Sequence, residues 1–148
     1  MIIGFHHAAI STPDLDRSIR FYTDVVGCRE AWAFSWDAGS EAADAMTGLK
    51  DSAARAVMLQ LGESYLELFE FSSPVPQSGD AARPVCDHGI THICLQVRNL
   101  HEEHDRMKAA GMRFMSPPLT QETGYVVYGR DPDGNVVELI EFTDIPAQ

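Results

Sequence analysis

His7-Ala-Ala-Ile-Ser-Thr-Pro-Asp-Leu15 and His92-Ile-Cys-Leu-Gln-Val-Arg-Asn-Leu100 repeat one another, each with a histidine eight residues before a leucine. The repeats also end alike, in Glu67-Leu-Phe-Glu-Phe71 and Glu138-Leu-Ile-Glu-Phe142. A duplicated unit therefore delivers two histidines and two glutamates from matched places. Imidazole and carboxylate are ligands that divalent metal ions accept, so the repeat indicates a metal site.

Each repeat predicts a strand, a helix and three further strands. In the first, residues 5–10 form the opening strand, and Thr12 is the expected N-cap with Pro13 at the first helical position. Gly27 ends that helix in the left-handed conformation. The expected apolar face consists of Leu15, Ile19, Tyr22 and Val26. The later strands are residues 29–36, 54–61 and 64–71.

The second repeat follows the same plan. Residues 90–97 predict a strand, Asn99 the N-cap of a helix, and Gly111 its end. Leu100, Met107 and Ala110 share the expected apolar face. The remaining strands are residues 112–115, 125–130 and 136–142, the last two joined by the tight turn Asp131-Pro-Asp-Gly-Asn135.

A chain of 148 residues suits a single domain built from both repeats. We expect an α+β fold of two β-α-β-β-β modules, with module one at about residues 5–71, a Pro/Gly-rich linker at 72–87 and module two at about 88–143. The spacing from histidine to glutamate is 60 residues in the first module and 46 in the second. Residues 37–52 account for this surplus, as a lid, a short helix over a pocket or a surface loop.

Composition narrows the function classes. The net charge of −11 repels phosphate backbones and anionic membrane surfaces, so we expect no nucleic-acid or membrane partner. No apolar run is long enough to span a bilayer, and the N-terminus lacks the pattern of a secretory signal, which predicts a cytoplasmic protein. Cys28, Cys86 and Cys94 are odd in number and scattered, as is typical of reduced thiols.

Strand alternation places all four candidate ligands on one face of a curved sheet, opposite the aliphatic residues that pack on the helices. Two ionised carboxylates on a partly apolar surface are costly unless a cation compensates them. The candidate ligands are His7, Glu67, His92 and Glu138. Such a set suits an open octahedral centre for Ni, Co, Zn, Mn, Fe or Mg, whereas a structural zinc site more often uses thiolates.

Other polar residues compete less well for this role. By strand parity, Glu70 and Glu141 fall on the helix-facing side. Cys86 and His88, just before His92, lie in the linker without a second cysteine pair. His101 and His104 are expected on the solvated helix face, and His6 alternates away from His7. The sequence contains no G-x-S-x-G motif and no phosphate-cradling glycine loop.

These motifs resemble the vicinal oxygen chelate superfamily, which includes glyoxalase I, methylmalonyl-CoA epimerase, extradiol dioxygenases and bleomycin resistance proteins. The resemblance covers residues 5–143 and is carried by the two histidine segments, Asp14-Leu-Asp-Arg-Ser-Ile-Arg-Phe-Tyr22 and Asp131-Pro-Asp-Gly-Asn-Val-Val-Glu138. It implies paired modules that form an open barrel around a metal, commonly in a homodimer. It also carries metal-ligand roles onto His7, Glu67, His92 and Glu138.

Within that family, a glutamate at the place of Glu67 favours the glyoxalase and epimerase branch. Ser11 and Phe71 stand where glutathione-binding enzymes carry arginine and asparagine, which argues against glutathione substrates. The leading expectation is thus a metal-dependent epimerase, isomerase or glyoxalase-type lyase acting on a small carboxylic or acyl-CoA compound. Glu138 and Glu67 are the candidate catalytic residues, because a carboxylate must move the proton next to the carbonyl.

Two other classes remain open. An extradiol-type dioxygenase would require Fe(II) or Mn(II) and consume O₂. A non-catalytic resistance protein would bind an aromatic drug between aromatic pocket walls. The candidate wall residues are Trp32, Phe34, Trp36, Tyr65 and Phe69.

Overall fold

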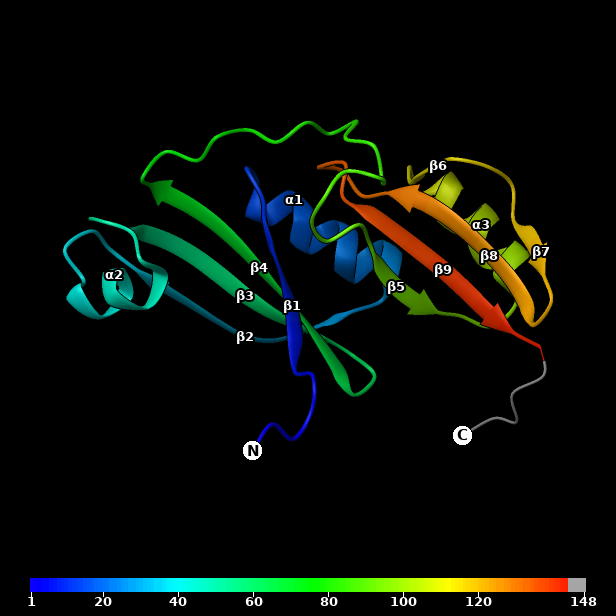
Figure 1. Ribbon diagram of the computed structural model, residues 1–148, viewed down its shortest axis with the longest axis horizontal. Helices are drawn as coiled ribbons and strands as arrows, with labels where there is room; N and C mark the ends of the chain where they lie inside the picture. Colours follow the sequence, from blue (N-terminus) through cyan, green and yellow to red (C-terminus); the bar gives the residue numbers. More distant parts are fainter. Residues whose placement is uncertain (144–148) are drawn as a thin grey trace. The chain divides into compact units, whose positions relative to one another are not determined.

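The computed structural model describes residues 1–143 and divides into two compact units, Met1–Ser78 and a second beginning at Gly79 (Figure 1). Each unit combines a mixed β-sheet with helices, which confirms the predicted α+β class and the paired β-α-β-β-β plan. None of the helices in residues 1–143 has the length and apolar character needed to cross a bilayer. How the two modules close around a common centre stays a prediction.

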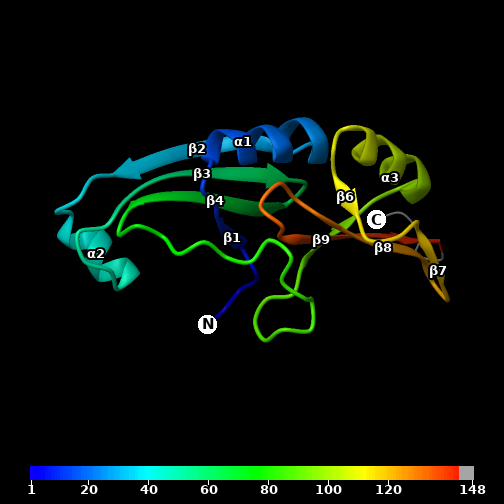
Figure 2. The same ribbon diagram turned by 90° about the horizontal axis from the view of Figure 1, so that it is seen from above.

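The first unit contains a four-stranded sheet in the order β1-β4-β3-β2. β1 runs parallel to β4, whereas β3 is antiparallel to both of its neighbours. The helix α1 lies along one face of this sheet (Figure 2), over a core that includes the fully buried Leu59 and Leu68. The elements are β1 (His7–Ser11), α1 (Leu15–Arg20), η1 (Phe21–Val26), β2 (Arg29–Trp36), α2 (Glu41–Thr47), β3 (Ala53–Leu61) and β4 (Ser64–Ser73).

The second unit repeats this arrangement with the strand order β5-β9-β8-β6 and with β7 paired to β8. β5 is parallel to β9, just as β1 is parallel to β4. Leu100 and Met107 of α3 are buried, as are Val137 and Leu139 of the sheet. The elements are β5 (Ile93–Gln96), α3 (Leu100–Ala109), β6 (Arg113–Phe114), β7 (Leu119–Gln121), β8 (Gly124–Arg130) and β9 (Val136–Phe142). The short β7 was not predicted, because three exposed residues carry no period.

The first helix starts later than predicted. Asp14, not Thr12, is the N-cap, since its carboxylate accepts a hydrogen bond from the Arg17 N–H at 2.9 Å. Pro13 therefore precedes the helix. The buried Thr12 hydroxyl instead hydrogen-bonds to the hydroxyl of Ser18 at 2.8 Å, an interaction across the first turn that residue preferences do not reveal.

The predicted face of the first helix is confirmed at Leu15 and Tyr22, which are buried, and wrong at Ile19 and Val26, which are only half-buried. Residues 21–26 form a π-helix, which rotates the buried stripe so that Phe21 and Val25 are buried as well. Gly27 ends it with φ 94°, as expected. In the second unit His104 is buried against the Phe114 ring rather than solvated, because it lies four residues after Leu100 on the same helix face. His101 is exposed, as predicted.

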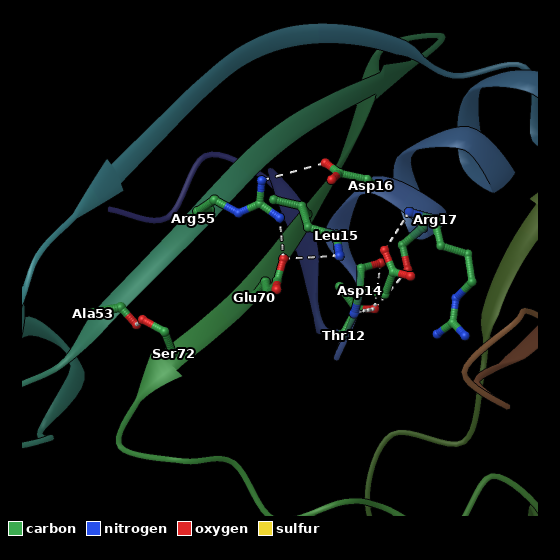
Figure 3. Close-up of polar contacts among 10 residues, drawn as sticks. Thr12, Asp14, Leu15, Asp16, Arg17, Ala53, Arg55, Glu70 and Ser72 are labelled. Carbon is green, nitrogen blue, oxygen red and sulfur yellow. Dashed lines mark hydrogen bonds and ion pairs between the residues drawn. The ribbon is translucent and has the colours of Figure 1, made fainter.

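A glutamate from each sheet accepts hydrogen bonds from the first N–H groups of α1 or α3. Glu70 accepts a hydrogen bond from the Leu15 N–H at 3.2 Å and forms an ion pair with Arg55 (Figure 3). In the second unit Glu141 accepts from the N–H groups of Asn99 and Leu100, both at 2.8 Å. Helix N-termini carry unsatisfied N–H groups and partial positive charge, so a carboxylate is favourable there. The parity prediction for Glu70 and Glu141 is confirmed.

We predict that Glu141→Ala and Glu70→Ala each lower the free energy of unfolding by about 1 kcal/mol, the usual value of an N-terminal cap. Urea titration followed by circular dichroism measures the change. Glu63→Ala, at an exposed position in the turn between β3 and β4, is the control and should change the midpoint little. Equal effects of all three substitutions would contradict the capping role.

The insertion at residues 37–52 contains the short helix α2, capped by Ser40 and ended by Gly48 with φ 69°. Asp44 organises its return to the sheet, since its carboxylate accepts hydrogen bonds from the N–H of Asp51 and from both the N–H and hydroxyl of Ser52. The Ser52 hydroxyl in turn accepts a hydrogen bond from the Trp36 indole N–H at 3.0 Å. The insertion thus fixes a tryptophan of β2.

Hydrogen bonds from the Ser52 side chain, the Ser52 N–H and the Asp51 N–H lower the pKa of Asp44 below its ordinary value of 3.8. A lowered pKa means that this stabilisation is present above the unfolded pKa and is lost as the pH falls through the folded value. We expect Asp44→Asn to be less stable than the parent at pH 7. The gap in urea midpoint should narrow as the pH is lowered from 5 to 3, and a widening gap would contradict the assignment.

Candidate metal centre

The first unit brings His7 and Glu67 together. His7 opens β1, and Glu67 lies midway along β4, where the parallel register pairs it with Ala9, two residues after His7. Side chains two apart on a strand share a face, so histidine and glutamate project from the same side of the sheet. His7 Nε2 lies 3.2 Å from Glu67 Oε2. Glu67 is buried, with 8% of its surface exposed, and such a carboxylate needs a cation or hydrogen-bond donors.

The second unit forms the equivalent pair. His92 Nε2 lies 3.1 Å from Glu138 Oε2. Glu138 is paired with Cys94 of β5, two residues after His92, which repeats the relation between Ala9 and Glu67. β5 begins at Ile93 rather than at the predicted residue 90, because Ile90 is exposed and makes no ladder contact. The predicted residues therefore meet as one histidine and one glutamate in each unit.

The Nδ1 atoms of His7 and His92, which point away from the glutamates, also have hydrogen-bond partners. Nδ1 of His92 lies 2.8 Å from the Thr91 hydroxyl, and Nδ1 of His7 lies 2.8 Å from Nδ1 of His6. The His6 ring stacks on Tyr65 with centroids 5.0 Å apart. A hydrogen bond at one ring nitrogen fixes the orientation of the other, and metal-binding histidines are usually held in this way. Each His–Glu pair therefore offers one imidazole nitrogen and one carboxylate, which are ligands that a divalent ion accepts.

The strand that carries Glu138 is aimed by its preceding turn. The buried Asp131 carboxylate accepts hydrogen bonds from the N–H groups of Asp133 and Asn135. Gly134 has φ 91° and lies so close to Ala81 that a Cβ atom would come within 2.3 Å of its carbonyl oxygen. Only glycine meets both demands, so the predicted tight turn fixes the register of β8 and β9.

The two glutamates differ in their surroundings. Ala9 and Met58 are the register partners of Glu67, whereas Cys94 and Tyr128 are those of Glu138. Burial, together with a hydrogen bond to Glu138, raises the pKa of the Cys94 thiol to about 12. Burial and the nearby Glu138 also raise the pKa of Tyr128, whose ring lies 5.1 Å from that of His92. Tyr128 was missed from the sequence, although counting back across the Asp131–Asn135 turn finds it.

The competing candidates are accounted for elsewhere. Cys86 and His88 are exposed in the connector, and Glu70 and Glu141 cap helices. Within residues 1–143, the His, Cys, Asp and Glu side chains gather in no group of three or more suited to a metal ion. The candidate ligands lie two to a unit.

Two β-α-β-β-β units, each pairing a histidine at the start of the first strand or just before it with a glutamate of the last strand, define the duplicated-module class of α+β protein. The chain belongs to the Glyoxalase/Bleomycin resistance protein/Dioxygenase superfamily, whose family model matches residues 4–139.

Individual relatives indicate which branch of this superfamily the chain is similar to. The chain is 33% identical over 152 residues to a 2-epi-5-epi-valiolone epimerase from Actinomyces sp, covering 93% of this chain and 79% of that protein. It is 27% identical to a lactoylglutathione lyase of Schizosaccharomyces pombe, over 91% of this chain but only 46% of the relative. A crystal structure of a glyoxalase family protein from Bacillus cereus superposes with a TM-score of 0.87 at 21% identity, over 96% and 95% of the two chains, and shows the shared fold. The chain is an enzyme of the glyoxalase and epimerase branch.

The thiols test the geometry around Glu138. Burial raises the pKa of Cys28 to about 11, and that of Cys94 is about 12, so at pH 8 each is almost wholly protonated. Cys86 and Cys94 are both exposed, and only Cys94 has a raised pKa, so we expect iodoacetamide to label Cys86 first in chelator-treated protein. Glu138→Gln should accelerate labelling of Cys94, because it removes the charge that helps to hold the proton. Glu122→Gln, in an exposed turn, is the control, and identical Cys94 rates in all three proteins would contradict the contact.

Proposed function

We propose that His7, Glu67, His92 and Glu138 together hold one divalent ion, and that the chain catalyses proton transfer next to a carbonyl group. The observation that carries this proposal is the matched contact of a histidine Nε2 with a glutamate oxygen in both units, at 3.2 and 3.1 Å. An epimerase or isomerase of a small carbonyl compound is the reaction that we favour, with a glyoxalase-type lyase second.

The donor set decides what a bound ion would supply. Two imidazoles and two carboxylates would hold a divalent ion, which would polarise the carbonyl oxygen of a substrate and so acidify the neighbouring C–H. The ordered Nδ1 contacts at Thr91 and His6 keep each Nε2 directed at its glutamate. The metal remains one of Ni, Co, Zn, Mn, Fe or Mg.

The glutamates then move the proton. One carboxylate removes the proton from the carbon next to the carbonyl, leaving the bonding electron pair delocalised onto the oxygen. The other glutamate, which starts the cycle as the protonated acid, delivers its own proton to the same carbon, so that the two glutamates exchange protonation states. No atom is gained or lost, and the carbon is inverted. Glu67 and Glu138 suit this exchange because each unit contributes one of them from the same place in the repeat.

The relatives support this reaction over the alternatives. The relatives are named as an epimerase and as a lactoylglutathione lyase. Both names describe reactions of carbonyl compounds, and neither names an oxygen-consuming reaction. Ser11 and Phe71, at the positions that would recognise glutathione, favour the epimerase over the lyase. The homodimer and the cytoplasmic location implied by the sequence stay predictions.

Solvent exchange tests the proposal. In D₂O, the purified protein should catalyse deuterium incorporation next to the carbonyl of small α-hydroxy ketones, measured by proton NMR. Glu138→Gln should lower that rate by roughly 10²- to 10⁴-fold, the usual contribution of a positioned acid–base group. Glu102→Gln, on the exposed face of α3, is the matched control and should leave the rate unchanged.

Two results would overturn the proposal. Wild-type exchange in Glu138→Gln would remove the assigned role of that carboxylate. Oxygen uptake with catechols, without any exchange, would identify a ring-cleaving dioxygenase instead.

A further inference from the structure

Six aromatic side chains form a continuous surface on the first unit. We call this set the aromatic platform, and it consists of Trp32, Phe34 and Trp36 of β2 with Tyr65, Phe69 and Phe71 of β4. The register places all six on one face, since Trp32, Phe34 and Trp36 pair with Met58, Ala56 and Ala54 of β3, which pair in turn with Glu67, Phe69 and Phe71.

The rings of the platform support one another. Phe34 and Trp36 each lie 6.1 Å from Phe69, both edge to face, and Trp36 lies 5.9 Å from Phe71. These contacts pass over β3, where the small side chains of Ala54 and Ala56 leave room for them. The hydrogen bond from the Trp36 indole to Ser52 fixes that ring further. The platform is thus ordered before any ligand arrives, which lowers the entropic cost of binding.

The platform is not the hydrophobic core of its unit. The core occupies the opposite face of the same sheet, where Val57, Leu59 and Leu68 are fully buried. Trp32 and Phe34 remain 48% and 39% exposed, and the other four rings are half-buried. Large aromatic residues left open together on one face mark a binding surface more often than a packing defect.

The platform is continuous with the candidate metal ligands. Tyr65 and Phe69 lie two residues before and after Glu67 on β4, and so flank it on the same face. Trp32 contacts the Tyr65 ring at 5.6 Å, and Tyr65 is the register partner of His7. A molecule seated on these rings therefore reaches the His7–Glu67 pair without leaving the sheet.

The charge of this face restricts what it binds. Between Trp32 and Trp36, and between Ala54 and Met58, the register places neither lysine nor arginine on the platform side. Arg55 projects to the opposite face, where it pairs with Glu70 and Asp16. Arg29 lies on the platform side at the end of the Tyr65 row, where its guanidinium donates a hydrogen bond to Gln60 Oε1 at 3.3 Å. Away from Arg29 and from the proposed metal ion, the stretch between Trp32 and Phe71 carries no cationic side chain, so this part of the surface suits a neutral ring.

We infer that the aromatic platform binds the ring of a neutral cyclic ketone or hydroxyketone and directs its carbonyl toward Glu67. The inference rests on the proposed function and narrows its substrate class, away from the acyl-CoA and carboxylic compounds expected from the sequence. Flat aromatic faces pack against the C–H face of a carbon ring, and a few polar groups at one end set its orientation.

The size of the platform favours a small ligand over a second copy of the chain. Six partly open rings leave on the order of 300 Å² accessible, given the area that aromatic side chains bury. A stable protein interface needs about 800 Å² from each partner. The platform alone falls well short of that, whereas it matches one face of a small ring compound.

The two tryptophans of the chain both lie on the platform, so their indole N–H signals report on it directly. We expect titration of the purified protein with 2-hydroxycyclohexanone to shift both signals in ¹⁵N–¹H spectra and to saturate. The acyclic 3-hydroxy-2-butanone should need at least tenfold higher concentration. Phe34→Leu should weaken binding of the cyclic probe about three- to tenfold, as expected for one aromatic contact. Tyr125 pairs with Glu141 on the helix-facing side of the second unit's sheet, away from the platform. The Tyr125→Leu variant should therefore bind the cyclic probe as tightly as the parent protein does.

The inference is overturned if the cyclic probe leaves both indole signals unmoved or binds no better than the acyclic one. It is also overturned if the signals follow protein concentration and Phe34→Leu changes the oligomeric state, because the platform is then a subunit interface. If the cyclic probe binds the platform but exchanges no deuterium, only the proposed function is contradicted. If cyclic ketones exchange deuterium but the indole signals do not move, only the binding role of the platform is contradicted.

Discussion

Parallel pairing between the first and last strands of each unit sets where every functional side chain points. It places Glu67 beside His7 and Glu138 beside His92 on one face, while Glu70 and Glu141, three residues further on, fall on the other face and cap helices. A slip of one residue would exchange these roles. Such a slip would put a carboxylate in the core where an aliphatic side chain now lies. An unpaired carboxylate there would cost several kcal/mol of stability. Fold stability and the proposed chemistry therefore depend on the same register.

The two units keep the His–Glu geometry and differ around it. In the first unit the glutamate has Ala9 and Met58 beside it, and aromatic rings extend along the sheet. In the second, Cys94 and Tyr128 bring polar hydrogens next to Glu138. Duplication thus accounts for the candidate ligands, and divergence accounts for the distinct surfaces next to them. We regard the aromatic side as the part that selects substrate.

Much of the fold follows from period and repetition. Alternation along the strands assigned Glu67 and Glu70 to opposite faces, and the left-handed Gly27 ended its helix where the sequence predicts. Periodicity and repetition did not predict which of two neighbouring polar residues caps a helix, or where a helix changes its winding. Thr12 bonds Ser18 and leaves the cap to Asp14, and a π-helical turn rotates the buried face. His104 looked solvated among acidic neighbours, yet its spacing from Leu100 buries it. Residue type misled there, and helical period would have corrected it.

The repeat predicted His7, Glu67, His92 and Glu138 as ligands of one metal; the structure brings them together as one His–Glu contact in each unit, and their binding of a metal stays a prediction. Whether the pairs serve one ion depends on how the units associate, which strand register does not determine. Metal content measures this most directly. One divalent ion per chain, lost on either His7→Ala or His92→Ala alone, is the result predicted for a shared centre. The account would be contradicted if the parent protein bound two ions per chain. It would also be contradicted if either histidine variant still bound one ion per chain.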